Sequence, residues 1–311
     1  MNQSSTRKLT EGAILIAFFA VLLLISTYVP LLSIVSTLFL ALPFIVYSAR
    51  YSLRESFLML AAALGVSAII STLLSLPLAL MYGTVGIVMG WMIQKGKSKF
   101  NIFIASTLVL IANILLMFVV SLVLLEQNIV EQFFTLMNES MENSFALAAS
   151  FGQDVTQIRT DWTSAVVLFE SLLPTLIVFS AASVILFIMI INFPIVRRLK
   201  IDVPKFQPFR EIVLPKSVIW YYLIVLIITL VSEPEAGSMF SLAIANLQIA
   251  LELLMIVQGL SFIHFYSHLK KWNKGIIILL TIFGLLLSPF TRILGIIDLG
   301  FDLRHRLLKN S

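Results

Sequence analysis

The residue best suited to chemistry is a carboxylate inside an apolar segment. Glu252 lies within LAIANLQIALELLMIVQGLSF, and Gln248 precedes it by four residues, which places both on one face of a helix. An ionised carboxylate near the centre of a bilayer is costly. Glu252 must therefore face water or the protein interior, be protonated, or pair with another group. Two roles are open for Glu252 and Gln248: a proton or ion relay, and a structural hydrogen bond between helices.

A second set of polar residues could contact a substrate. Asn113 is the clearest polar side chain in the middle of an apolar segment. Its amide either ties two helices together or reads the hydrogen-bonding edge of a ligand. Glu170, Tyr28 and Tyr82 are its companions if a pocket opens to the outside. Aromatic residues near the ends of spans more often anchor a chain at the membrane interface.

Several common kinds of active site are missing from the sequence. The chain has no cysteine, and it contains no GxxxxGK(S/T) loop, no HExxH and no GxSxG. His264 and His268 are four apart, as metal ligands often are, but no third ligand matches them. We therefore expect no catalytic residues, no metal and no cofactor. Any ATP-driven step would need a separate polypeptide.

The composition indicates whether the chain is a soluble protein or a membrane protein. Hydrophobic side chains make up 59% of the 311 residues and charged ones 12%, whereas soluble domains have roughly 25% charged residues. The mean hydropathy is +1.03. These values exclude a soluble enzyme and predict an integral membrane protein in contact with lipid. The net charge of +5 is explained by basic loops, so it does not indicate a nucleic-acid partner.

Apolar stretches near the length of a transmembrane helix occur along the whole chain. A bilayer core of about 30 Å needs roughly 20 apolar residues, and these stretches lack the alternation of membrane β-strands. The expected helices are Gly12–Val29, Leu31–Ala49, Ser56–Leu74, Leu76–Ile93, Ile102–Leu125, Thr163–Phe193, Val218–Val231 and Met239–Phe262. A ninth stretch, Gly275–Gly300, is interrupted at Ser288 and Pro289.

Charge distribution sets the expected orientation. Lys and Arg lie on alternate loops, which marks those loops and the N-terminus as cytoplasmic. A full ninth span would place Arg304 and Arg306 outside, so we expect Gly275–Gly300 to fold back as a broken hairpin. The long outer loop, Glu126–Trp162, repeats apolar residues every three or four positions and predicts an amphipathic helix. That helix either docks on the bundle or covers a cavity. Its apolar positions are Ile129, Phe133, Met137, Met141, Phe145 and Ala148.

Three small-residue pairs at spacing four favour close helix packing in lipid: Ala13 with Ala17, Ala61 with Gly65, and Gly86 with Gly90. The runs LTEGAILIAFFAVLLLISTYVPLL, ALPFIVYSARYSLRESFLMLAAALGVSAI and SLPLALMYGTVGIVMGWMIQKGK resemble the substrate-binding S components of energy-coupling-factor transporters over about residues 7–200. The whole chain, including its GIIDLGFDLRHR ending, resembles the YybS-like bacterial membrane proteins, a group related to those S components.

The resemblance implies a six-helix core in the bacterial cytoplasmic membrane. In S components an alanine-x-x-x-alanine pair in the first helix meets a transmembrane coupling subunit, and Ala13 and Ala17 match that pair. The chain departs from ordinary S components in two places. Ser52 and Ser56 stand where glycines are common, and helices beyond residue 216 are absent from ordinary S components.

We therefore expect an all-α polytopic transmembrane bundle in three parts. Residues 1–200 form the S-component-like core, including the amphipathic segment 126–162. Residues 201–216 are a basic cytoplasmic loop, and residues 217–311 are a C-terminal extension ending in the broken hairpin. The expected role is binding a small molecule outside for uptake, with a coupling subunit and separate ATPases as partners. The alternatives are a non-transporting scaffold that recruits cytoplasmic partners and a proton-coupled carrier using Glu252.

Overall fold

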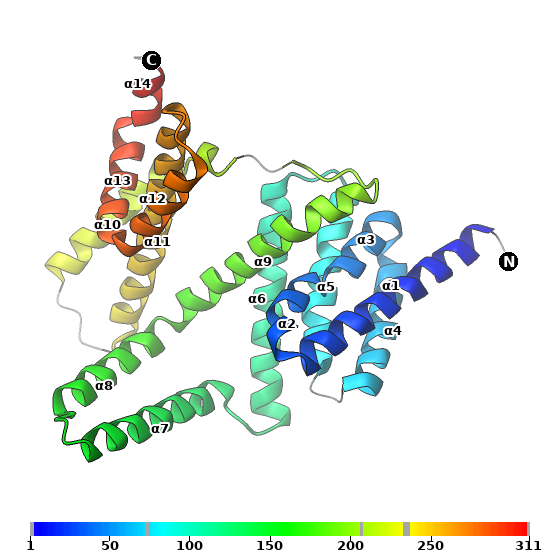
Figure 1. Cartoon of the computed structure of the whole chain (residues 1–311), viewed down its shortest axis with the longest axis horizontal. Coiled ribbons are helices and arrows are strands. Elements are labelled where there is room, and N and C mark those ends of the chain that lie inside the picture. Colours follow the sequence, from blue (N-terminus) through cyan, green and yellow to red (C-terminus); the bar gives the residue numbers. More distant parts are fainter. Residues whose placement is uncertain (1–2, 72–74, 206–207, 233–236, 310–311) are drawn as a thin grey trace. The chain divides into compact units, whose positions relative to one another are not determined.

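The chain is helical throughout its described parts. The computed structural model describes residues 3–71, 75–205, 208–232 and 237–309, and no strand occurs among them (Figure 1). The predicted all-α fold is confirmed. The elements are α1 (Gln3–Tyr28), α2 (Pro30–Phe39), α3 (Leu42–Arg50), α4 (Leu53–Ser71), α5 (Leu76–Gln94), α6 (Lys99–Leu124), α7 (Ile129–Ser150), α8 (Thr156–Ser171), α9 (Leu173–Arg198), η2 (Phe209–Glu211), α10 (Ser217–Val231), α11 (Met239–Leu269), α12 (Lys274–Leu286), α13 (Ser288–Phe301) and α14 (Leu303–Lys309).

Seven helical segments in the described residues are long and apolar enough to cross a membrane. They are α1, the pair α2 and α3 taken together, α4, α5, α6, α9 and α11. The pair α12 and α13 passes the same test only as a unit, and its axis bends by 104° at the break. The helix predicted at residues 218–231 is present as α10, but its 15 residues are short for a span.

One predicted helix is wrong. Residues 163–193 were expected to form a single long helix, but α8 ends at Ser171 and α9 begins at Leu173. Pro174 explains the break, because proline has no backbone N–H and disfavours a helical conformation at the residue before it. The predicted span 31–49 is likewise divided between α2 and α3, where Pro43 lies in the first turn of α3. The end of the predicted span 56–74 falls outside the described residues.

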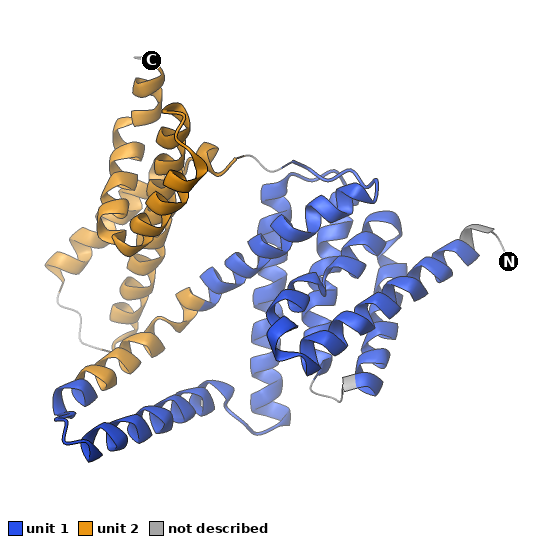
Figure 2. Ribbon diagram, viewed as in Figure 1, with its two compact units in different colours: residues 1–160, 177–205 blue, residues 161–176, 206–311 orange. Residues whose placement is uncertain are grey.

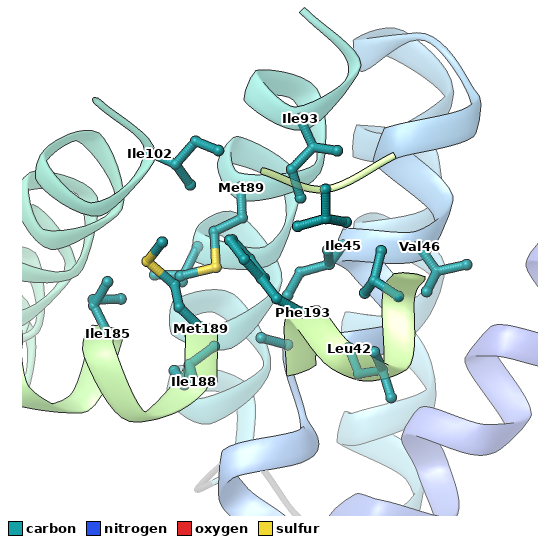
Figure 3. Packing of buried hydrophobic residues seen from close by; sticks show 14 of the residues in the cluster. Leu42, Ile45, Val46, Met89, Ile93, Ile102, Ile185, Ile188, Met189 and Phe193 are labelled. Carbon is teal, nitrogen blue, oxygen red and sulfur yellow. The ribbon is translucent and has the colours of Figure 1, made fainter. Parts of the chain in front are cut away.

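The chain divides into two compact units (Figure 2). Unit 1 comprises residues 1–160 and 177–205, and unit 2 comprises residues 161–176 and 206–311. In unit 1, side chains from α3, α5, α6 and α9 form one hydrophobic cluster, which includes Ile45, Met89, Ile102, Met189 and Phe193 (Figure 3). The close approach of α5 to α3 requires Gly90, because an added Cβ would lie 2.4 Å from the carbonyl oxygen of Ile45.

Unit 2 is built around α11, which packs against α10, α12 and α13. Two glycines let α11 and α13 approach at backbone distance. A Cβ on Gly259 would lie 2.0 Å from the Thr291 carbonyl oxygen, and one on Gly295 would lie 2.1 Å from the Met255 carbonyl oxygen. The hydrophobic cluster of this unit includes Tyr222, Met255 and Leu299. This tight packing fixes the polar side chains of α11 and α13 against each other.

The amphipathic helix expected in the long loop is α7. Four predicted positions are buried or partly buried: Met137, Met141, Phe145 and Ala148. At the start of the helix, Ile129 and Phe133 are exposed and Phe134 is buried instead. In the connection to α8, the carboxylate of Asp154 accepts a hydrogen bond from the Thr156 backbone N–H at 3.0 Å. That bond holds the pKa of Asp154 below its ordinary value.

Candidate functional site

The candidate site in unit 2 is a line of polar side chains along α11. The polar residues described on this helix include Asn246, Gln248, Glu252, Gln258, Ser261 and His264. The helix has 31 residues, so it is about 46 Å long and exceeds a hydrocarbon core of about 30 Å by about 16 Å. Glu252 lies roughly 20 Å from one end and 26 Å from the other. Every placement in which α11 spans the core therefore puts Glu252 inside it.

Glu252 forms an ion pair with Arg292 of α13. Arg292 Nη1 lies 2.6 Å from Glu252 Oε1, and the two side chains are 28% and 19% exposed. Gln248 Nε2 donates to the same carboxylate oxygen at 3.2 Å. Thr229 of α10 donates to Gln248 Oε1, also at 3.2 Å. Pairing is one of the states the sequence left open for Glu252. Its partner was missed, although an arginine inside an apolar run is itself a signal for such a partner.

A second ion pair lies deeper in the protein. Arg304 Nε, from α14, donates to Asp298 Oδ2 at 2.9 Å, and these side chains are only 11% and 2% exposed. Gln258 Nε2 donates to the same oxygen at 2.6 Å, while Gln258 Oε1 accepts from the Leu214 backbone N–H at 2.9 Å. The charges are thus paired and hydrogen-bonded, which a buried ion pair requires.

Arg304 also holds the segment that leads into α10. Its guanidinium donates from Nη1 to the Arg210 carbonyl at 2.7 Å and from Nη2 to Ser261 Oγ at 3.1 Å. Ser261 Oγ in turn lies within hydrogen-bond distance of the carbonyl oxygens of Phe209 (2.8 Å) and Ile212 (2.7 Å). The second half of the predicted basic loop is therefore fastened to α11.

Asp302 and Arg306 are four residues apart, a spacing that allows an ion pair on one helix, but no such pair is found in the described residues. Asp302 instead lies 3.7 Å from Lys216 Nζ, in an exposed pair. Asp302 separates α13 from α14 and has a left-handed conformation, with φ of 52°. The four-residue spacing to Arg306 therefore does not belong to one continuous helix, which is what the pairing rule assumes.

Asn246 satisfies the backbone at the break between α8 and α9. Its Nδ2 donates to the Ser171 carbonyl at 2.7 Å, and its Oδ1 accepts from the Thr175 backbone N–H at 3.1 Å. A helix break inside lipid leaves such groups without partners. Asn246, at this end of α11, therefore has a structural role.

The proposed ligand residues of unit 1 have different environments. Asn113 is 6% exposed, and its Nδ2 donates to Thr84 Oγ1 of α5 at 3.0 Å and to the Val109 carbonyl at 2.7 Å. Tyr82 is partly buried. It packs against the hydrophobic cluster that includes Ile45 and Met89, and against a second cluster of unit 1 that includes Phe19 and Phe44. Tyr28 is 61% exposed, and its hydroxyl lies 3.4 Å from the Ile70 carbonyl. Asn113 and Thr84 thus connect α6 to α5.

Glu170 belongs to a different unit from Asn113, Tyr82 and Tyr28. It is exposed near the end of α8 and belongs to unit 2. His264 Nε2 lies 2.9 Å from Thr281 Oγ1 of α12, while His268 is exposed. No group of three metal-ligating side chains occurs among the residues that the structure describes.

Ala13 and Ala17 are both exposed on α1. Their neighbours Ile14 and Phe18 are exposed as well. The start of the helix is fastened to the adjacent elements by polar contacts. Lys8 Nζ lies 2.7 Å from Glu55 Oε1, Tyr51 donates to Glu11, and Arg50 forms an ion pair with Glu11. The alanine face is therefore held in a fixed position on unit 1.

Comparison with known proteins agrees with the membrane fold. The family model described as "Predicted membrane protein (DUF2232)" matches residues 17–299. The Bacillus subtilis (strain 168) protein described as "Uncharacterized protein YybS" is 32% identical over 308 residues, covering 97% of this chain and 99% of that protein. No solved structure matches. Because the family model covers most of the chain, the protein belongs to this DUF2232 family of integral membrane proteins.

Proposed function

We propose that the protein binds a small molecule on the outer side of the bacterial cytoplasmic membrane and presents it for uptake by a separate coupling subunit with ATPases. The observation that carries this proposal is the exposed Ala13 and Ala17 face of α1. Small residues let two helices approach closely in lipid. The resemblance of the first 200 residues to S components supplies the role of that face.

The anchoring of α1 supports the same role. A docking face must keep its shape when a partner binds, because ordering a mobile element would reduce the affinity. The contacts of Lys8 with Glu55 and of Arg50 with Glu11 fix the start of α1 next to the alanine face. Basic residues at this end also support a cytoplasmic N-terminus.

The substrate contacts in this proposal are Asn113, Tyr82 and Tyr28 of unit 1. Asn113 is the central member, since it is buried within the bundle and its amide is already oriented by Thr84. No cofactor is required, because the energy comes from the partner ATPases.

Tryptophan substitutions test the coupling face. Ala13→Trp with Ala17→Trp places two large side chains where a partner helix must approach, so co-purification of a coupling subunit and ATPases from the host membrane should be lost. Ala62→Trp, at an exposed alanine of α4, is the matched control and should retain them. Unchanged recovery of the same partners with both variants would remove the main support for the proposal.

A second candidate function is a non-transporting scaffold. The observation that favours it is the fastening of residues 209–214 to Ser261, Gln258 and Arg304, which presents the basic loop in a fixed form. Replacing the exposed Lys205 and Lys216 of this loop with glutamate should then release cytoplasmic proteins from the purified complex. The uptake proposal instead predicts that these substitutions leave the coupling subunit bound.

A further inference from the structure

The Glu252–Arg292 pair has hydrogen-bonding capacity that its protein neighbours do not use. A guanidinium group has five N–H donors and an ionised carboxylate has two acceptor oxygens. Arg292 Nη1 and Gln248 Nε2 both meet Glu252 Oε1. Within the described ranges, Glu252 Oε2 and the remaining N–H groups of Arg292 have no hydrogen-bond or ion-pair partner.

The contrast with the second ion pair shows that the chain can seal such a pair with its own atoms. Asp298 is 2% exposed, and Arg304 uses Nε, Nη1 and Nη2 in hydrogen bonds. Glu252 and Arg292 are 19% and 28% exposed at a depth that lies inside the hydrocarbon core. Lipid tails cannot solvate a guanidinium, so the open side of this pair needs a polar occupant.

The chemistry of the open groups defines that occupant. Arg292 offers N–H donors to an acid group, and Glu252 Oε2 offers an acceptor to an amine. A simple anion would leave one net negative charge in a low-dielectric site, and a simple cation would leave one positive charge, both of which are costly. A small zwitterion satisfies both groups and keeps the site neutral.

We propose that Glu252 and Arg292 form an intramembrane binding site for a small zwitterion of the α-amino acid type. The carboxylate of the ligand pairs with Arg292, and its ammonium group pairs with Glu252. Gln248 donates to Glu252 Oε1, the oxygen already paired with Arg292, so the ligand contact of Glu252 uses Oε2 and does not involve Gln248. The site lies in unit 2 and is independent of the coupling face on α1. A zwitterionic lipid head group has the same chemistry, so the test must separate the two sources.

The absence of cysteine from the sequence makes thiol accessibility a direct test. Gln248→Cys places a single thiol beside the pair, and Leu247→Cys is the matched control at the same depth on an exposed apolar position. The full chain is reconstituted in phosphatidylglycerol nanodiscs, which contain no ammonium lipid, and reacted with a water-soluble anionic methanethiosulfonate. Gln248→Cys should react at least about tenfold faster than Leu247→Cys. Apolar surroundings raise the pKa of a thiol, and an increase of one pKa unit lowers the concentration of reactive thiolate about tenfold.

A mixture of the twenty common α-amino acids should then slow the reaction of Gln248→Cys, whereas propionate with ethylamine should not. Arg292→Gln should abolish this protection, and Arg292→Lys, which retains the charge without the planar donors, should weaken it. For each Arg292 variant, the rate with amino acids is compared with the rate of the same variant without them. A variant that folds poorly is recognised separately, because its cysteines at positions 248 and 247 react at the same rate.

Four results would overturn the proposal. Equal rates at the two positions would show that the pair is not open to water. Protection that survives Arg292→Gln, or no protection by any amino acid, would show that the pair is not the binding group. Protection by phosphatidylethanolamine nanodiscs alone, with no effect of amino acids, would assign the site to a lipid head group rather than a free solute.

Discussion

Charged side chains inside an apolar chain are tolerated only where other groups compensate them, and the two ion pairs of unit 2 do this to different extents. Asp298 and Arg304 are nearly sealed, while Glu252 and Arg292 are open on one side. Removing one partner of a sealed pair leaves an uncompensated charge, which is usually far more costly than the net gain from the pair itself.

Asp298→Ala should therefore lower the free energy of unfolding by about 3–5 kcal/mol, because Arg304 would remain buried without a counter-charge. Lys216→Ala, which removes the exposed partner of Asp302, should cost less than about 1 kcal/mol. Unfolding in mixed detergent micelles measures both. The double variant Asp298→Ala with Arg304→Ala should cost less than the sum of the single changes, and additive effects would contradict a coupled pair.

Asn113 permits a separate test of its structural role. Asn113→Ala and Thr84→Val should each destabilise unit 1 by about 1 kcal/mol, because hydrogen bonds between membrane helices have values of that order. Thermal unfolding of the single and double variants gives the coupling. If Asn113 also contacts a substrate, Thr84→Val should retain ligand binding while Asn113→Ala loses it. Equal loss in both would assign Asn113 to helix packing alone.

Prediction at the residue scale succeeded for local features and failed for distant partners. The neighbouring residue types predicted the apolar surroundings of Glu252, and the four-residue spacing predicted that it shares a helix face with Gln248. Arg292 was not, because 39 intervening positions separate it from Glu252 and the hairpin brings them together. Arg304 lies only six residues after Asp298, but the left-handed Asp302 ends α13 between them, so helical spacing did not predict this pair.

At the scale of helices, close packing in unit 2 depends on glycine rather than on interlocking side chains. Gly259 and Gly295 allow the backbones of α11 and α13 to meet, and this approach places Arg292 beside Glu252. Without a hydrophobic driving force between helices in lipid, such backbone proximity is a main source of their association.

Gly259→Ala should destabilise the protein by about 1–3 kcal/mol, the usual cost of overpacking, because its Cβ would meet the Thr291 carbonyl. Gly65→Ala in α4 is the matched control, since nothing lies within 4 Å of its added Cβ. It should be neutral or stabilise the chain by up to about 1 kcal/mol through helix propensity. Similar melting temperatures for the two variants would show that α11 and α13 can separate without cost.

Helix boundaries were predictable where hydropathy and proline agreed. The sequence placed an interruption at Ser288 and Pro289, and α13 begins at Ser288. The break before Pro174 was missed, because the apolar run continues through it and the compensating group, Asn246, lies far along the chain. Hydropathy therefore finds the apolar segments, but it does not show how a broken backbone is satisfied.

For the whole molecule, the bend between α12 and α13 determines which side of the membrane holds the C-terminus. The two helices have 13 and 14 residues, about 20 Å each, so neither crosses a 30 Å core alone. Their 104° bend leaves two arrangements, a broken span and a hairpin that enters and leaves on the same side. We predict the hairpin from the charge distribution. Lys270, Lys271 and Lys274 before it and Arg304, Arg306 and Lys309 after it would then share the cytoplasmic side.

Fusion reporters test this topology directly. We expect green fluorescent protein at the C-terminus to fluoresce and alkaline phosphatase there to be inactive, because both behave this way in the cytoplasm. Fusions after Gly96 and after Gly152 provide the inner and outer references, since Gly96 lies in the connection before α6 and Gly152 lies after α7, which follows the other end of α6. Active phosphatase at the C-terminus would mean that residues 275–300 cross the membrane. The positive-inside distribution would then fail at this end of the chain, because three basic residues would lie outside without an acidic excess to balance them.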